Sequence, residues 1–380
     1  MIKPEYKELL QILSCFLHQK KYIPYADFDS AELRRLANIH SISGIVGYML
    51  QQGMDDWAKD YLATCAETVQ RIFAFKNLEK ILDREKIPRL MVKGFVVRED
   101  YPIPQLRTFG DIDVIIHPGD RERTDSLMKN LGYSCEEDWE PSYSYRKGQE
   151  IYEFQTDLLD KNPTDRADFK RFFSDPWAHA FKTGEYRYQL DPEFCFLYVL
   201  MHLAKHVSAR GAGLRMYLDV AVLIQKNDVN WEKVIVAIQE MKMEKFFNTV
   251  LSAVEDWFDV TSPIHYDKIE ERVLSELLDF TMKGGTFGFQ GEDKSTMMLR
   301  ESKVGKVAMI IRRIFPSAKT ISSRYTYLKK RPWLLPVAWV HRVVLNRERL
   351  RGERVLLREI ISSDEGKVEK IKRMYSEIGL

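Results

Sequence analysis

The hydrophobic period of the chain changes at residue 89, and the helical period returns after residue 160. Residues 5–88 repeat apolar side chains every three to four positions, which predicts amphipathic helices, including a long one that ends before Pro88. From residue 89 onward this repeat gives way to short apolar runs that are bounded by turn residues. The runs predict strands at 90–92, 112–116 and 151–155. We therefore expect an α+β fold, with a small mixed β-sheet as its core and helical regions on the N-terminal and C-terminal sides.

This division predicts four regions. They are an N-terminal helical region (1–88), a small α/β core (89–160), a helical domain (161–299) and a basic helical segment (300–380). Within the first region, a short capped helix is expected to begin at Ser30 and to end near Gly44.

The charge of the chain is unevenly distributed. The net charge is only +2, but residues 300–358 hold sixteen Lys or Arg against three Asp or Glu, so this segment carries +13 and the rest carries −11. Aromatic side chains lie between its basic residues, as in surfaces that bind nucleic acid or an anionic membrane. The alternative is a solvated helical surface, which the spacing of the arginines through apolar stretches favours. Binding of an anionic partner by residues 300–358 therefore stays an alternative to the solvated surface.

Compartment is indicated by the cysteines and by the N-terminal sequence. The four cysteines are scattered without a CxxC pair, which is typical of reduced thiols in an intracellular protein. The N-terminal stretch carries Glu5 and Glu8, where a secretion signal needs basic and then purely apolar residues. We found no apolar stretch near the roughly 20 residues of a transmembrane segment. A soluble, cytoplasmic protein is expected.

The most informative short motif is Gly110-Asp111-Ile112-Asp113-Val114. Side chains two apart in a strand point to the same face, so the two carboxylates should lie side by side. Like charges at that distance repel unless a cation lies between them, and oxygen ligands favour Mg²⁺ or Mn²⁺. The alternative is a polar strand entrance after a glycine turn.

Residues on either side of this motif favour the metal site. Lys93-Gly94 ends the preceding strand, where glycine lets backbone N–H groups approach a phosphate. Arg107 is close enough in sequence to reach a phosphate or the carboxylates. Glu153 lies in the third predicted strand and supplies a third carboxylate, unless Asp157 takes that place. Three carboxylates in this order can converge on two metal ions for an in-line displacement at phosphorus.

The stretch LMVKGFVVREDYPIPQLRTFGDIDVII, followed by LGY, resembles the uncharacterised bacterial nucleotidyltransferase family of the polymerase-β-like superfamily. The resemblance extends over roughly residues 30–225. It implies that Asp111 and Asp113 bind the metal and that Glu153 is the third carboxylate, which helps to activate the attacking hydroxyl. Lys93-Gly94 takes the position of the superfamily's Gly-Ser phosphate-binding turn. Because Phe95 follows where the superfamily has serine, phosphate contact would depend on Lys93 and on backbone N–H groups.

Two further pairs have simpler interpretations. His202 and His206 are four residues apart on a predicted helix and could ligate a metal, but a packed or phosphate-facing pair is favoured. Arg215 and Asp219 have the spacing of a local ion pair within one helix, which the family resemblance makes a possible wall of the active-site cleft.

Two functional hypotheses follow. In the first, the protein is a nucleotidyltransferase that uses Mg²⁺ or Mn²⁺ to move a nucleoside monophosphate from a nucleoside triphosphate to a hydroxyl of an acceptor, which is a small molecule, protein or RNA. In the second, the protein is a catalytically silent nucleotide-binding or scaffold module whose basic segment recruits a partner, RNA or membrane surface. Carboxylate oxygens that converge within about 4 to 5 Å favour the enzyme.

Overall fold

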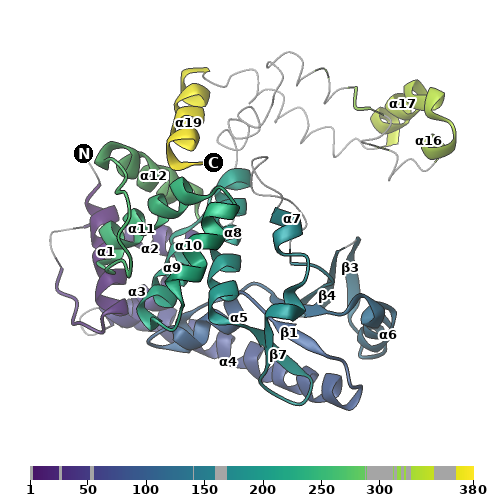
Figure 1. Ribbon diagram of the computed structural model, residues 1–380, viewed down its shortest axis with the longest axis horizontal. Coiled ribbons are helices and arrows are strands. Elements are labelled where there is room, and N and C mark those ends of the chain that lie inside the picture. The colour runs from purple at the N-terminus through teal and green to yellow at the C-terminus, as the bar shows by residue number, and fades with distance from the viewer. Residues whose placement is uncertain are drawn as a thin grey trace. The chain divides into compact units, whose positions relative to one another are not determined.

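The computed structural model divides the chain into two compact units, Met1–Phe287 with Ile378–Leu380, and Gly288–Glu377 (Figure 1). The described residues are 3–24, 28–51, 55–139, 141–158, 169–286, 288, 311, 315–317, 321, 327–345 and 365–380. Most of the predicted basic segment 300–358 lies outside them. The helices described after residue 288 are α16 (Tyr327–Lys330), η5 (Pro332–Leu334), α17 (Leu335–Leu345) and α19 (Glu365–Ile378).

The first unit is built around a mixed sheet of seven strands in the order β3-β4-β5-β2-β1-β7-β6. The strands are β1 (Arg89–Met91), β2 (Ile112–Ile116), β3 (Ser134–Trp139), β4 (Ser142–Lys147), β5 (Glu150–Gln155), β6 (Ala180–Lys182) and β7 (Arg187–Leu190). The expected α+β fold class is confirmed, and β1, β2 and β5 are the three predicted strands. The four outer strands were not predicted. Strands β6 and β7 belong to a stretch for which the sequence predicts helices, and most of their residues are partly exposed.

The centre of the sheet sets the position of the acidic residues. Strand β2 pairs with β1 in antiparallel and with β5 in parallel orientation. In the β2–β5 register, Asp113 lies opposite Glu153. Residues directly opposite each other on neighbouring strands have side chains on the same face. The two carboxylates are therefore neighbours through backbone pairing alone.

The two faces of the sheet differ in polarity. One face packs its apolar side chains, among them Val114 and Phe154, against α4 (Asp55–Arg84) and α6 (Arg121–Asn130). Because side chains alternate between faces, the residues between these apolar positions point to the opposite side. Burial of the apolar face thus fixes the direction of Asp113 and Glu153.

Helices that precede the strands in the sequence pack against helices that follow them in the first unit. Besides α4 and α6, the helices of this unit are α1 (Pro4–Leu17), α2 (Ser30–Ile39), α3 (Ser43–Leu50), α5 (Gly94–Val97), α7 (Phe169–Phe172), α8 (Pro192–Arg210), α9 (Leu214–Lys226), α10 (Trp231–Glu240), α11 (Glu244–Phe258) and α12 (Glu271–Gly284). Single 3₁₀ turns are η1 (Arg98–Asp100), η2 (Pro104–Leu106), η3 (Pro118–Asp120) and η4 (Pro176–His179). In Figure 1, α1 (purple) and α11 (green) lie side by side, and His18 Nε2 is 3.1 Å from the carbonyl oxygen of Phe258. Within the described part of the chain, every helix is too short or too polar to cross a lipid bilayer.

The predicted helix from Ser30 is correct in its start but not in its end. Helix α2 ends at Ile39, and its N-terminal cap is the Asp29 side chain. Gly44 lies inside the next helix, α3, and does not end a helix. A Cβ on Gly44 would lie 2.6 Å from the side chain of Thr64 on α4, so the absence of a side chain lets α3 and α4 approach closely.

The Gly47→Ala substitution is expected to destabilise this helix pair. The new Cβ would lie 2.6 Å from the carbonyl oxygen of Trp57 and 2.8 Å from the backbone nitrogen of Tyr61, and backbone atoms cannot rotate away. Overpacking of this kind costs about 1–3 kcal/mol. Urea unfolding should show that loss, while the control Gly119→Ala, where nothing lies within 4 Å of the new Cβ, should show little change. Equal losses in both variants would contradict the close-packing argument.

The turn after α2 joins the N-terminal helices to the C-terminal ones. His40 Nδ1 accepts a hydrogen bond of 3.2 Å from the backbone N–H of Leu214, at the start of α9. The Ile39 carbonyl accepts one of 2.7 Å from the N–H of Thr286, just beyond α12. Burial lowers the pKa of His40 to about 4, so the ring is neutral near pH 7.

The depressed pKa of His40 predicts a loss of stability in acid. The unfolded chain binds a proton at this ring near pH 6.5 and the folded chain near pH 4, so stability is full above pH 6.5 and is lost as the pH falls between these values. The free energy of unfolding should fall by on the order of 3 kcal/mol over this range because of His40. Urea unfolding from pH 7 to pH 4 should show a smaller decline in His40→Asn, whose Oδ1 can still accept from Leu214. The same decline in both proteins would exclude His40 as the source.

Candidate active site

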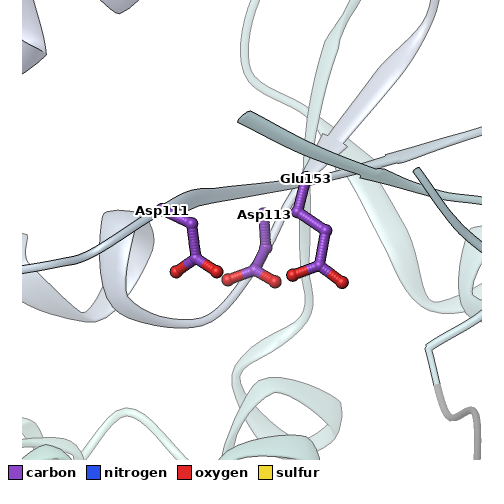
Figure 2. A group of neighbouring side chains, drawn as sticks. All are labelled: Asp111, Asp113 and Glu153. Carbon is purple, nitrogen blue, oxygen red and sulfur yellow. The ribbon is translucent and has the colours of Figure 1, made fainter. Parts of the chain in front are cut away.

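Three carboxylates converge on the polar face of the sheet, as the sequence predicts. Asp111 directly precedes β2, Asp113 is within β2, and Glu153 is the facing residue of β5. One oxygen of each carboxylate lies within 4.8 Å of the others. Figure 2 shows the three side chains pointing to the same side. Glu153, and not Asp157, is the third member of this group.

The three carboxylates repel one another at this distance when they are ionised. Asp113 is buried, with 7% of its surface exposed. Burial raises its pKa to about 7, and the neighbouring charges of Asp111 and Glu153 act in the same direction, against the opposing effect of Lys93. A divalent cation would remove this repulsion, and three oxygen ligands suit Mg²⁺ or Mn²⁺.

Lys93 points into the group from the turn after β1. Its Nζ forms an ion pair with Asp113 Oδ1. Burial acts to lower the pKa of Lys93, but the carboxylates, Asp113 first among them, raise it well above its usual value, so the ammonium stays charged. The backbone of Lys93 has φ 54° and ψ −137°, a region that favours glycine and is strained for lysine.

Gln155 and Ser142 also contact the carboxylates, although the sequence analysis did not identify them. The Gln155 amide donates hydrogen bonds of 3.1 Å to Asp113 Oδ1 and 2.8 Å to Glu153 Oε1. The Ser142 hydroxyl donates to Glu153 Oε1. The alternation of β5 contained the signal for Gln155, because a residue two positions after Glu153 must share its face.

Arg107, expected to contact phosphate, is held in a buried ion pair at the edge of the site. Its Nε and Nη2 donate to the two carboxylate oxygens of Asp219 at 3.0 and 2.5 Å. Tyr101 donates its hydroxyl to the same carboxylate at 2.7 Å. Asp219 therefore does not form the predicted local ion pair with Arg215. That prediction is wrong because a bidentate partner lies closer in space, 112 positions away in the sequence.

The guanidinium of Arg107 explains the glycine at position 94. A Cβ on Gly94 would lie only 2.0 Å from Arg107 Nη1, so the arginine packs directly on the turn that carries Lys93. Arg215 contacts the residue that follows Arg107, since its Nη1 donates a hydrogen bond of 2.7 Å to the carbonyl of Thr108. Burial, together with the neighbouring Arg107, lowers the pKa of Arg215 to about 10.

The three carboxylates line a cavity of about 540 Å³, together with Lys93, Gly94, Arg107, Ser142 and Gln155. The wall that does not belong to the sheet comes from α8 and α9 and contains His202, Lys205, His206 and Arg215. The rings of the two histidines are in contact, with centroids 4.5 Å apart. Burial lowers the pKa of His202 well below its usual value, and the neighbouring His206 adds to this effect, so the His202 ring is neutral.

Comparison with known proteins identifies the family of this chain. Residues 26–259 match the model of an uncharacterised nucleotidyltransferase family, and the match contains all seven strands and all three carboxylates. The chain belongs to this family. The protein is thus a nucleotidyltransferase, which confirms the predicted family and enzyme class.

One solved structure is also similar to this nucleotidyltransferase. It is the solution structure of the antibiotic-resistance factor ANT(2″)-Ia, which matches 46% of this chain and 90% of its own, with 14% identity and a TM-score of 0.31. A search of curated proteins returned no match.

The Asp219→Asn substitution should strongly destabilise the nucleotidyltransferase. It leaves the buried Arg107 guanidinium without a counter-charge, which costs about 3–5 kcal/mol. The control is Glu32→Gln, which removes the carboxylate from an ion pair with Arg35, whose side chain is 54% exposed, and should cost less than about 1 kcal/mol. Urea unfolding followed by tryptophan fluorescence measures both. Similar losses in the two variants would show that the buried pair does not stabilise the fold.

Proposed function

We propose that this nucleotidyltransferase moves a nucleoside monophosphate from a nucleoside triphosphate to a hydroxyl of an acceptor, with Mg²⁺ or Mn²⁺ as its cofactor. The observation that carries the proposal is the convergence of Asp111, Asp113 and Glu153 within 4.8 Å. They line a cavity whose opposite wall is basic. A catalytically silent scaffold would not need three carboxylates that converge this closely, so the geometry favours the enzyme.

The residues present fit a hard divalent cation. Asp111 and Asp113 would hold it, because the carboxylates of both line the cavity at the start of β2. When bound, such a cation neutralises the charge that develops on the transferred phosphoryl group.

The transfer itself is a displacement at phosphorus. The acceptor oxygen forms a bond to the α-phosphorus, while the bond from that phosphorus to the oxygen bridging to the β-phosphate breaks. Pyrophosphate leaves with the electron pair of the broken bond. Glu153 either takes the proton of the acceptor hydroxyl or holds a second cation, as both roles place its carboxylate beside the reacting atoms.

The phosphates of the donor are assigned to the turn after β1. Lys93 presents a charged ammonium to the cavity, and Gly94 has no side chain to cover the backbone N–H groups of the turn. The Phe95 ring lies in the apolar core behind the sheet, so residue 95 offers no hydroxyl to the phosphates. Arg107 reaches the cavity edge and supports this turn. Arg215, on α9, adds positive charge to the opposite wall.

Removing the two aspartates tests the proposal. The Asp111→Ala, Asp113→Ala double variant should lose Mg²⁺-dependent triphosphate binding, and its rate of transfer should fall at least about 100-fold, because the charge of the transferring group is no longer stabilised. Each labelled nucleoside triphosphate is incubated with the protein, Mg²⁺ and a cell extract, and labelled products are sought.

The matched control is Asp279→Ala, which removes an exposed carboxylate from α12. It should bind triphosphate and form product as the wild-type protein does. Triphosphate binding that depends on Mg²⁺ and survives the double substitution would overturn the proposal.

A further inference from the structure

Hydrogen-bond donors of the protein fill the space between Asp113 and Glu153. The Gln155 side chain bridges the two carboxylates, with its Nε2 3.1 Å from Asp113 Oδ1 and 2.8 Å from Glu153 Oε1. An ionised carboxylate only accepts hydrogen bonds, so the amide nitrogen, and not the amide oxygen, must face both groups. With 7% of its surface exposed, Gln155 is held in this position by its surroundings.

Two further donors use the same two oxygens. Asp113 Oδ1 also accepts from the Lys93 ammonium, and Glu153 Oε1 also accepts from the Ser142 hydroxyl. Each of these oxygens therefore receives two hydrogen bonds, which is one for each of its lone pairs. Neither of these two oxygens has a lone pair left for a metal ion, so a cation bound at Asp113 would use its Oδ2.

This arrangement conflicts with a pair of metal ions. Ions in two-metal sites lie about 3.5–4 Å apart and share carboxylate ligands. A second ion that bridges Asp113 Oδ1 and Glu153 Oε1 would have to displace the Gln155 amide and the donors from Lys93 and Ser142. It would also bring two more positive charges next to a buried ammonium.

We infer that the site holds one divalent cation, at Asp111 and Asp113, and that Lys93, Gln155 and Ser142 take the place of a second. The inference rests on the proposed function and deepens it. Glu153 is then no metal ligand, and its role is to take the proton of the acceptor hydroxyl. Gln155 is a positioning residue whose amide bridges the carboxylates of Asp113 and Glu153 in place of a metal ion.

Counting bound Mn²⁺ tests the inference without any measurement of activity. The full chain is dialysed against Mn²⁺ with and without inorganic tripolyphosphate, which stands in for the phosphates of any nucleotide. Bound Mn²⁺ is counted, and its electron paramagnetic resonance spectrum is recorded. The wild-type protein should bind about one Mn²⁺ per chain in both conditions, with the spectrum of an isolated ion, because ions about 4 Å apart would couple magnetically.

Gln155→Glu is the informative variant, since it exchanges the amide for a fourth carboxylate of the same shape. It should raise the count to about two and give a magnetically coupled pair. The control Gln189→Glu adds the same charge on β7 and should leave the count at about one. Asp111→Asn should lower Mn²⁺ affinity at least about tenfold.

The outcomes separate the inference from the proposed function. A coupled Mn²⁺ pair in the wild-type protein would overturn the single-ion inference and leave the proposed function standing. A Gln155→Glu variant that still binds one ion, or a Gln189→Glu variant that binds two, would overturn the assignment of Gln155. A wild-type protein that binds no Mn²⁺, with or without tripolyphosphate, would overturn both proposals.

Discussion

The buried ion pair between Arg107 and Asp219 determines how the candidate active site of this nucleotidyltransferase is assembled. The stretch between β1 and β2 contains only short helical turns, so local hydrogen bonds alone do not fix its path. Arg107 attaches it to α9 through two hydrogen bonds, while its guanidinium rests on Gly94. Desolvating two charges costs several kcal/mol per ion, and the bidentate geometry, with Tyr101 as an additional donor, offsets that cost. The turn that carries Lys93 is therefore positioned by a helix far along the chain.

The convergence of Asp111 and Asp113, at the start of β2, with Glu153 on β5 was predictable, whereas the ion pair was not. A period of two is a local property, so Asp111, Asp113 and Glu153 could be assigned from alternation and order along the chain. Arg107 and Asp219 are separated by 112 positions, and the nearer Arg215 satisfied the local pairing rule. Only the folded arrangement shows which arginine faces the carboxylate.

The outer strands and the glycines show the same limit. Strands β6 and β7 have little buried apolar surface, so the hydrophobic pattern that reveals a central strand is missing from them. Gly44 carries the usual signal of a helix end, but the demand at this position comes from α4, which packs against it. Gln155 shares the face of Glu153 by the same alternation, but a neutral amide carries no charge that would mark it in the sequence as part of an acidic cluster.

The backbone of Lys93 is strained, while its side chain forms an ion pair with Asp113. A non-glycine residue at φ 54° and ψ −137° costs of order 1–3 kcal/mol, and glycine would adopt the same turn without that penalty. Glycine, however, has no ammonium to offer Asp113. The chain thus keeps a strained backbone at the position whose side chain pairs with Asp113. A glycine here would relax the backbone and at the same place leave a buried carboxylate without its counter-charge, so the relief of strain does not translate into a more stable protein.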